Sequence, residues 1–170
     1  SNPLGEETSI MRTTALPSML EILALNYNRR NSDVKLFEIA KEYVPQAENE
    51  LPIERKMLML GAFGSKTDFF SLKGSVEVLL DRLNIRGYEF EAVNDASAYH
   101  PGRTAKITAD GEQIGLIGEI HPNVAANYGI DCRVYAAELD VAKMFAAVGE
   151  EKTYTPLPKF PAVTRDLAII

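Results

Sequence analysis

Residues 104–120 read TAKITADGEQIGLIGEI, and this stretch decides the fold class. Apolar and polar residues alternate on both sides of Asp110-Gly111. Alternation with a period of two is typical of β-strands, and Asp-Gly is among the strongest short-range signals for a tight hairpin turn. The stretch therefore predicts two antiparallel strands, 104–109 and 112–120, joined by a two-residue turn.

Further strands and helices are predicted on both sides of this hairpin. The other strands cover residues 34–44, 56–63, 88–93 and 133–139. Helices are predicted at 14–30, 69–84, 122–128 and 141–148, from apolar residues at helical spacing and from Thr, Asp, Pro and Gly near their ends. Strands joined mostly by hairpins, without β-α-β alternation, favour an α+β fold over a doubly wound parallel sheet.

The apolar patterns of two of these segments indicate where they lie in the fold. Strand 34–44 carries apolar residues on both faces, such as Phe37 and Ile39 on one and Val34 and Ala40 on the other, so we expect a central strand. Helix 69–84 has the clearest amphipathic pattern in the chain, and we expect its apolar side to face the core. That side consists of Leu72, Val76, Leu79, Leu80 and Leu83.

Length and composition exclude several classes of protein. The chain has 170 residues and a mass of 18.8 kDa, with 46% hydrophobic and 25% charged residues, which fits one globular domain. A net charge of −6 without a basic stripe disfavours sequence-independent nucleic-acid binding by this segment alone. The single Cys132 excludes an internal disulfide and a multi-cysteine zinc site. With a single cysteine we expect a reducing, cytoplasmic location. No apolar run is long enough to span a membrane.

The two ends of the chain suggest a piece of a longer protein. The chain starts with Ser1-Asn2 and has no initial methionine, so we expect an excised segment. Pro156, Pro158 and Pro161 predict a stiff linker, and residues 163–170 look like the first strand of an unfinished domain. We expect the tail from residue 153 to be held loosely, because an unpaired strand lacks its neighbours.

The residues that could carry chemistry are few. His100 and His121 each precede a proline, which restricts the histidine to an extended backbone. They could form a metal pair or supply an acid–base group, but no Asp, Glu or Cys completes a site at ligand spacing. We therefore favour turn residues whose imidazoles bond to the backbone.

The glycines and one carboxylate also receive structural interpretations. Gly111, Gly115 and Gly118 follow a hairpin rather than joining a strand to a helix, so close packing or a bulge is favoured over a phosphate-binding loop. Glu38, within an apolar strand, is the carboxylate we expect to be buried; pairing with a lysine or arginine is favoured over a role as general base. These residues alone indicate no catalytic, cofactor-binding or metal-binding site.

A series of short motifs nevertheless resembles one family. In order, they are Asn2-Pro3-Leu4, Met11-Arg12-Thr13, Leu36-Phe37-Glu38-Ile39, Asp68-Phe69-Phe70, Leu72-Lys73-Gly74, His100-Pro101-Gly102-Arg103, Ile117-Gly118-Glu119, His121-Pro122, Glu138-Leu139-Asp140, Lys159-Phe160-Pro161 and Arg165-Asp166-Leu167-Ala168. Each motif alone is weak. Together, in this order and at these spacings, they resemble the beta subunit of bacterial phenylalanyl-tRNA synthetase over nearly the whole chain.

The resemblance implies a fold and a division into domains. Residues 1–150 would form most of a catalytic-like domain of the class II aminoacyl-tRNA synthetase type, an antiparallel sheet flanked by helices, partial at its N-terminal side. Residues 151–158 would be a linker. Residues 159–170 would be the first strand of a truncated, ferredoxin-like anticodon-binding domain.

The resemblance also implies a function. In this family the alpha subunit forms the aminoacyl-adenylate, and the beta domain packs against it in an assembly of two alpha and two beta subunits. The chain would be a non-catalytic structural and subunit-interaction module of a ligase that attaches phenylalanine to its tRNA. ATP and magnesium would be used by the holoenzyme, and tRNA would be bound through it. By itself the fragment is expected to be inactive.

Two alternatives remain open, a free-standing class II paralogue that forms an adenylate and an unrelated domain that binds a small molecule. An active class II enzyme binds ATP through two arginine side chains. The first should follow a strand like residues 37–43, where this chain has Val44; the second should open a helix, where residues 137–142 read AELDVA. Lys41 or Lys143 could substitute, but a flexible ammonium does not replace a bidentate guanidinium. We therefore expect neither ATP nor phenylalanine to bind productively.

Overall fold

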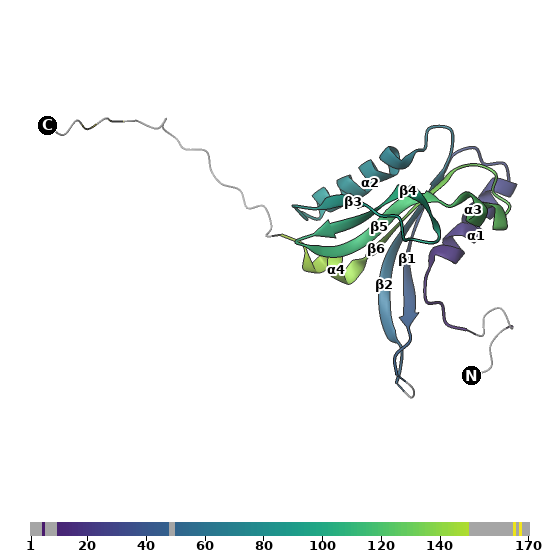
Figure 1. Ribbon diagram of the computed structural model, residues 1–170, viewed down its shortest axis with the longest axis horizontal. Helices are drawn as coiled ribbons and strands as arrows, with labels where there is room; N and C mark the ends of the chain where they lie inside the picture. The colour runs from purple at the N-terminus through teal and green to yellow at the C-terminus, as the bar shows by residue number, and fades with distance from the viewer. Residues whose placement is uncertain (1–4, 6–9, 48–49, 150–164, 166, 168–170) are drawn as a thin grey trace.

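The computed structural model describes residues 5, 10–47, 50–149, 165 and 167 (Figure 1). The elements are, in chain order, α1 (Leu16–Asn28), β1 (Val34–Val44), β2 (Ile53–Phe63), α2 (Phe69–Arg82), β3 (Glu89–Ala92), β4 (Tyr99–Ala109), β5 (Glu112–Ile120), α3 (Pro122–Asn127), β6 (Val134–Asp140) and α4 (Val141–Ala146). Every one of these elements was predicted, with bounds that differ by a few residues at most of their ends. The largest difference is at β4, which starts at Tyr99 and includes residues that we expected in a loop.

The strands form one sheet in the order β1-β2-β6-β5-β4-β3, and every neighbouring pair is antiparallel. The α+β prediction is therefore confirmed. The prediction that strand 34–44 is central is wrong, because β1 lies at an edge. One of its faces turns outward, where Phe37 is 73% and Ile39 65% exposed.

Helices pack on both faces of the sheet. Buried residues of α1 and α3 share one apolar cluster with β1, β2 and the even-numbered residues of β6. Buried residues of α2 and α4 share a second cluster with β4, β5 and the odd-numbered residues of β6. In Figure 1, α1 and α3 lie together at one end of the sheet, and the β1–β2 hairpin extends away from the other elements.

The helix ends follow the local sequence. Asp68 caps α2: its side chain accepts from the Ser71 backbone, and the Ser71 hydroxyl accepts from the Asp68 backbone. Leu72, Val76 and Leu80 of this helix are buried, while Leu79 and Leu83 are partly buried against them. The N-cap of α1 is Ala15 rather than a threonine, although the Thr14 hydroxyl accepts from Leu16 N–H at 3.3 Å.

The glycines of the central hairpin have separate structural roles. Asp110 and Gly111 both have positive φ, 50° and 80°, as a two-residue hairpin turn requires. A Cβ on Gly115 would lie 2.5 Å from the Glu138 carbonyl oxygen, and one on Gly118 would lie 2.8 Å from Thr104 Oγ1. The prediction of close packing is confirmed.

Two further observations concern the ends of the chain and membranes. No helix among the described residues has the length and apolar character needed to cross a membrane. The linker 151–158, and the predicted terminal strand apart from Arg165 and Leu167, lie outside the residues that the structure describes.

Candidate functional site

A polar hollow of about 320 Å³ lies where β2, β5 and β6 meet the start of α4. Its lining includes both cations and carboxylates, and it contains the end of β6 where the sequence lacks the expected arginine. The residues are Arg55, Met57, Gln113, Ile114, Gly115, Leu116, Glu138, Asp140 and Lys143. This hollow is the place to ask whether the chain has a nucleotide-binding surface.

The anions of the hollow already have partners within the chain. Glu138 Oε1 accepts from the hydroxyl of buried Tyr99 at 2.6 Å. Asp140 Oδ1 accepts from the backbone of Ala142 and Lys143 at 3.0 and 3.1 Å, and so caps α4. Burial raises the pKa of Glu138, and burial also raises the pKa of Tyr99, well above its usual value.

The cations of the hollow are also engaged. Arg55 pairs with Glu42 at 2.9 Å, and Lys143 Nζ donates to Glu112 at 3.4 Å and to the Gln113 carbonyl at 3.1 Å. Lys41, the other possible substitute for a missing arginine, pairs with Glu54 at 2.6 Å. A nucleotide phosphate would have to replace these internal partners.

The two positions where arginine is expected in an active enzyme lie at element boundaries. Val44 is the last residue of β1, and Val141 is the first residue of α4. Neither side chain can bond a phosphate oxygen. The expectation that ATP does not bind productively stays a prediction.

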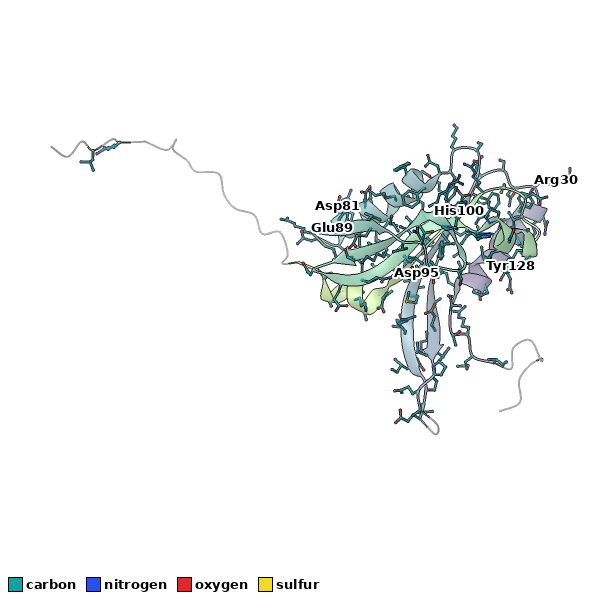
Figure 2. All side chains as sticks on the ribbon, in the orientation of Figure 1. Arg30, Asp81, Glu89, Asp95, His100 and Tyr128 are labelled. Atoms are coloured by element: carbon teal, nitrogen blue, oxygen red, sulfur yellow. The ribbon has the colours of Figure 1, made fainter. Side chains whose placement is uncertain are left out.

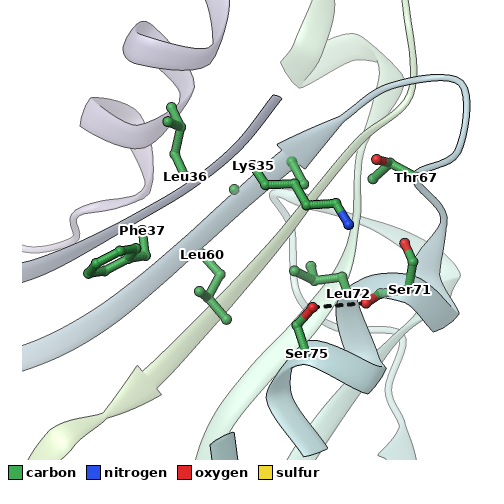
Figure 3. Close-up of a pocket in the computed structure, with 10 residues that line it drawn as sticks. Lys35, Leu36, Phe37, Leu60, Thr67, Ser71, Leu72 and Ser75 are labelled. Atoms are coloured by element: carbon green, nitrogen blue, oxygen red, sulfur yellow. Dashed lines mark hydrogen bonds between the residues drawn. The ribbon is translucent and has the colours of Figure 1, made fainter. Parts of the chain in front are cut away.

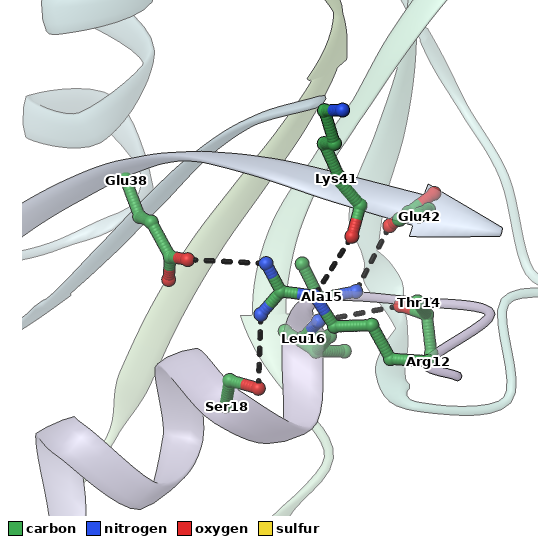
Figure 4. Close-up of polar contacts among 8 residues, drawn as sticks. All are labelled: Arg12, Thr14, Ala15, Leu16, Ser18, Glu38, Lys41 and Glu42. Atoms are coloured by element: carbon green, nitrogen blue, oxygen red, sulfur yellow. Dashed lines mark hydrogen bonds and ion pairs between the residues drawn. The ribbon is translucent and has the colours of Figure 1, made fainter. Parts of the chain in front are cut away.

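The buried carboxylates are not the one expected from the sequence. Glu38 is partly exposed and pairs with Arg12 at 3.3 Å. The prediction that Glu38 is buried is therefore wrong, and the prediction that it pairs with a basic residue is confirmed. Glu42, on the same face of β1, is only 1% exposed. One of its oxygens accepts from Ala15 N–H at 2.9 Å (Figure 4), and the other accepts from Arg55 at 2.9 Å. Glu42 is two residues from buried Ala40, a period-two signal that could have identified it.

Arg12 holds the segment before α1 against the edge strand. Its Nε donates to the Lys41 carbonyl at 2.8 Å, its Nη1 donates to the Ser18 hydroxyl, and its backbone oxygen accepts from Tyr43 N–H at 2.9 Å. Figure 4 shows the side-chain contacts of Arg12 between β1 and α1. They point to a structural role.

The two histidines come together in space. Their ring centroids are 6.3 Å apart and the planes are 26° from parallel; Figure 2 labels His100. His121 Nδ1 accepts from Asn123 N–H at 3.1 Å, and His100 Nδ1 donates to the Pro101 carbonyl at 2.6 Å. The prediction of backbone-bonded imidazoles is confirmed. Within the described part of the chain, no three His, Cys, Asp or Glu side chains gather as metal ligands.

A partly uncovered apolar face lies on the other side of the β1–β2 hairpin from α1: its β1 residues are exposed, whereas its β2 residues are partly buried. We call it the hairpin face; it consists of the cross-strand pairs Phe37–Leu60 and Ile39–Leu58. An adjoining hollow of about 140 Å³ separates it from Ser71 and Ser75 of α2 (Figure 3). Lys35 lies next to Phe37 in β1, and Lys41 and Lys56 form the cross-strand pair beyond Ile39. Sequence reasoning placed Phe37 and Ile39 in a central strand and missed this surface.

Comparisons with known proteins relate the chain to one family. A family model described as "Phenylalanyl tRNA synthetase beta chain CLM domain" matches residues 1–141. The beta subunit of phenylalanine–tRNA ligase from Clostridium tetani is 48% identical over 170 residues, and that from Clostridium acetobutylicum is 43% identical. Each alignment covers 99% of this chain and 21% of the relative, so the chain spans about a fifth of their length.

Solved structures show a similar fold. A pyrrolysyl-tRNA synthetase from Desulfitobacterium hafniense has a TM-score of 0.64 at 15% identity, over 78% of this chain and 48% of that chain. A second structure of pyrrolysyl-tRNA synthetase from the same organism gives a TM-score of 0.63. At this identity the likeness concerns the fold alone.

Proposed function

Since this chain belongs to the family of phenylalanyl-tRNA synthetase beta chain CLM domains, we propose that it is a non-catalytic structural and subunit-interaction module of a phenylalanine–tRNA ligase. In this role its sheet supports a larger enzyme that attaches phenylalanine to tRNA with ATP. None of its described residues is assigned a catalytic, cofactor-binding or metal-binding role.

The hairpin face is the observation that carries the interaction role. Phe37 and Ile39 are mostly exposed, on a sheet face that neighbouring strands bury under α2. Contiguous exposed apolar side chains with a polar rim mark interaction sites on soluble proteins. A partner that covers this face would remove them from water, at about 25 cal/mol per Å² of apolar area.

The polar hollow supports the non-catalytic part of the proposal. Its arginine and lysine are paired with carboxylates, and Glu138 and Asp140 would face the phosphates of a nucleotide. Loss of one preorganised donor to a transition state costs about 10²–10³ in rate. In a free-standing adenylate-forming enzyme, the alternative, Arg55 and Lys143 would have to leave these carboxylates to hold a phosphate.

The finer assignments belong to the same proposal. The antiparallel sheet and its likeness to pyrrolysyl-tRNA synthetase support a class II synthetase fold. The partner is the alpha subunit, in an assembly of two alpha and two beta subunits. ATP and magnesium act at the holoenzyme's active site in the alpha subunit, and the assembly is cytoplasmic. Residues 1–150 form this domain, and 159–170 begin an anticodon-binding domain.

The test uses the full-length beta subunit and a tagged alpha subunit. We expect the two to co-purify and to catalyse ATP–pyrophosphate exchange with phenylalanine, and we expect the beta subunit alone to show none. Phe37→Asp combined with Ile39→Asp should weaken assembly at least about tenfold, because it places two charges on an apolar interface. Phe145→Asp is the matched control, since this phenylalanine is equally exposed on α4.

Exchange by the beta subunit alone would favour the free-standing enzyme. Undiminished assembly of the double variant would show that the hairpin face is not the contact.

A further inference from the structure

One buried carboxylate holds two arginines from separate parts of the chain. Arg103 of β4 donates through Nη1 to both oxygens of Glu119 in β5, at 2.9 and 3.0 Å. Arg133, just before β6, places Nε 3.9 Å from Glu119 Oε1. The Glu119 side chain is only 4% exposed. The two guanidinium groups are thus positioned by a carboxylate that solvent hardly reaches.

These three residues form a wall shared by two hollows. The first, of about 590 Å³, has walls rich in aromatic rings and lies between the start of α2 and strands β3 and β4. The second, of about 410 Å³, lies on the α3 side and contains His100 and Cys132. Both volumes are in the range of sites that hold a small molecule or a nucleotide. Arg103, Glu119 and Arg133 line both hollows, and we call the two hollows together the arginine groove.

The first hollow offers flat rings to a ligand. Its aromatic residues are Phe69, Phe70, Phe90 and Tyr135. Phe70 is 74% exposed, and its ring lies nearly perpendicular to that of Phe69, with centroids 5.6 Å apart; its exposure leaves the ring accessible for stacking. Lys73 Nζ lies 4.4 Å from the Phe90 centroid, a cation–π contact that fixes that ring.

The lining of the first hollow is less acidic than the chain as a whole. It has three cations, Lys73, Arg103 and Arg133, against two carboxylates, Asp68 and Glu119, in a chain of net charge −6, and Lys73 also pairs with Glu77 of α2. The Arg133 side chain is 69% exposed and lies 3.9 Å from its carboxylate; it also bonds to Tyr135, and its exposure leaves it accessible to a ligand. A guanidinium held in this way suits a phosphate, because it presents several donors in a fixed plane.

We propose that the arginine groove binds an unpaired nucleotide of RNA, with the base stacked on Phe70 and the phosphate on Arg103 and Arg133. An unpaired base can leave its helix and stack on an aromatic ring, whereas the bases of a duplex are covered on both faces. A site of this kind uses two or three cations and does not require a basic stripe along the chain. That the RNA is the ligase's tRNA rests on the proposed function.

The test compares two single variants in the assembled ligase of alpha and full-length beta subunits. Phe70→Ala should weaken tRNA binding about 5- to 150-fold, the range for loss of one stacked base, and leave its salt dependence unchanged. Arg133→Ala should weaken binding and also lower the slope of log affinity against log salt by about 0.7, the value for one single-strand phosphate contact. Arg103 is avoided, because its loss would leave buried Glu119 without its closest partner.

The controls are Phe145→Ala, an exposed phenylalanine on α4, and Arg82→Ala, a basic residue in the last turn of α2. Both should bind tRNA as the wild type does.

If Phe70→Ala and Arg133→Ala assemble with the alpha subunit and bind tRNA normally, the inference is overturned and the proposed function stands. If the wild-type subunits do not assemble, the proposed function fails. The inference is then decided on the beta subunit alone with a five-nucleotide single-stranded RNA, where unchanged binding by both variants overturns it.

Discussion

At the scale of the single residue, we expect alanine substitutions at two glycines to change the stability of the fold in opposite directions. A methyl group on Gly115 would lie 2.5 Å from a backbone oxygen of β6, so Gly115→Ala must move a strand and should cost about 1–3 kcal/mol or more. Gly74 lies inside α2 with nothing within 4 Å of an added Cβ, so Gly74→Ala should stabilise the chain by about 0.4–1 kcal/mol. Urea denaturation measures both, and a destabilising Gly74→Ala would contradict the open space at that site.

We expect the buried Glu138 to make the stability of the folded chain depend on pH. Its pKa is raised, first of all by burial, so the folded state holds this proton more tightly than the unfolded chain does. The contribution of Glu138 to stability is therefore greatest below the ordinary carboxyl pKa and declines as pH rises through the raised value. Glu138→Gln keeps an acceptor for Tyr99 and should remove this decline in denaturation curves measured across that range. Glu112→Gln, at an exposed carboxylate, should leave the decline in place.

The residues of the proposed sites were only partly accessible to sequence reasoning. The histidines could be interpreted because the following prolines restrict their backbone. The cluster of Arg103, Glu119 and Arg133 could not be predicted, because it depends on the pairing of β4, β5 and β6. Burial of Glu42 rather than Glu38 depends on the position of α1, which covers one end of β1.

At the scale of elements, the N-terminus of α2 makes a direct prediction. Asp68 and Ser71 satisfy each other's backbone N–H groups there. Asp68→Ala should lower the free energy of unfolding by about 0.5–2 kcal/mol, since it leaves a helix donor without its acceptor. Asp68→Ser, which restores an acceptor, should recover most of the loss. Equal losses in the two variants would mean that the cap does not stabilise this helix.

Element types followed from local sequence, whereas their positions did not. The central hairpin was predicted because Asp110-Gly111 supplies the required turn and the flanking residues alternate. The position of β1 was mistaken because an apolar strand face has the same pattern whether a helix or solvent covers it. Phe37 and Ile39 satisfy the rule for a buried strand, yet they face outward in this chain.

At the scale of the molecule, the sheet order predicts a gradient of local stability. β6 has hydrogen-bonded neighbours on both sides and helices over both faces, whereas β3 is a four-residue edge strand. Amide hydrogen exchange should therefore be slowest at Ala136 and Ala137 and much faster at Phe90 and Glu91. Exchange measured by NMR or mass spectrometry checks this order. Equal protection of β3 and β6 would contradict it.

The hairpin face also has a consequence for the supply of subunits in a growing cell. A copy that has not met its partner displays two large apolar side chains on an edge strand, a surface on which chaperones and proteases act. Under the proposed function, synthesis of excess beta subunit would then lead to its clearance rather than its accumulation. The abundance of this chain would then be set by the amount of partner available to cover it.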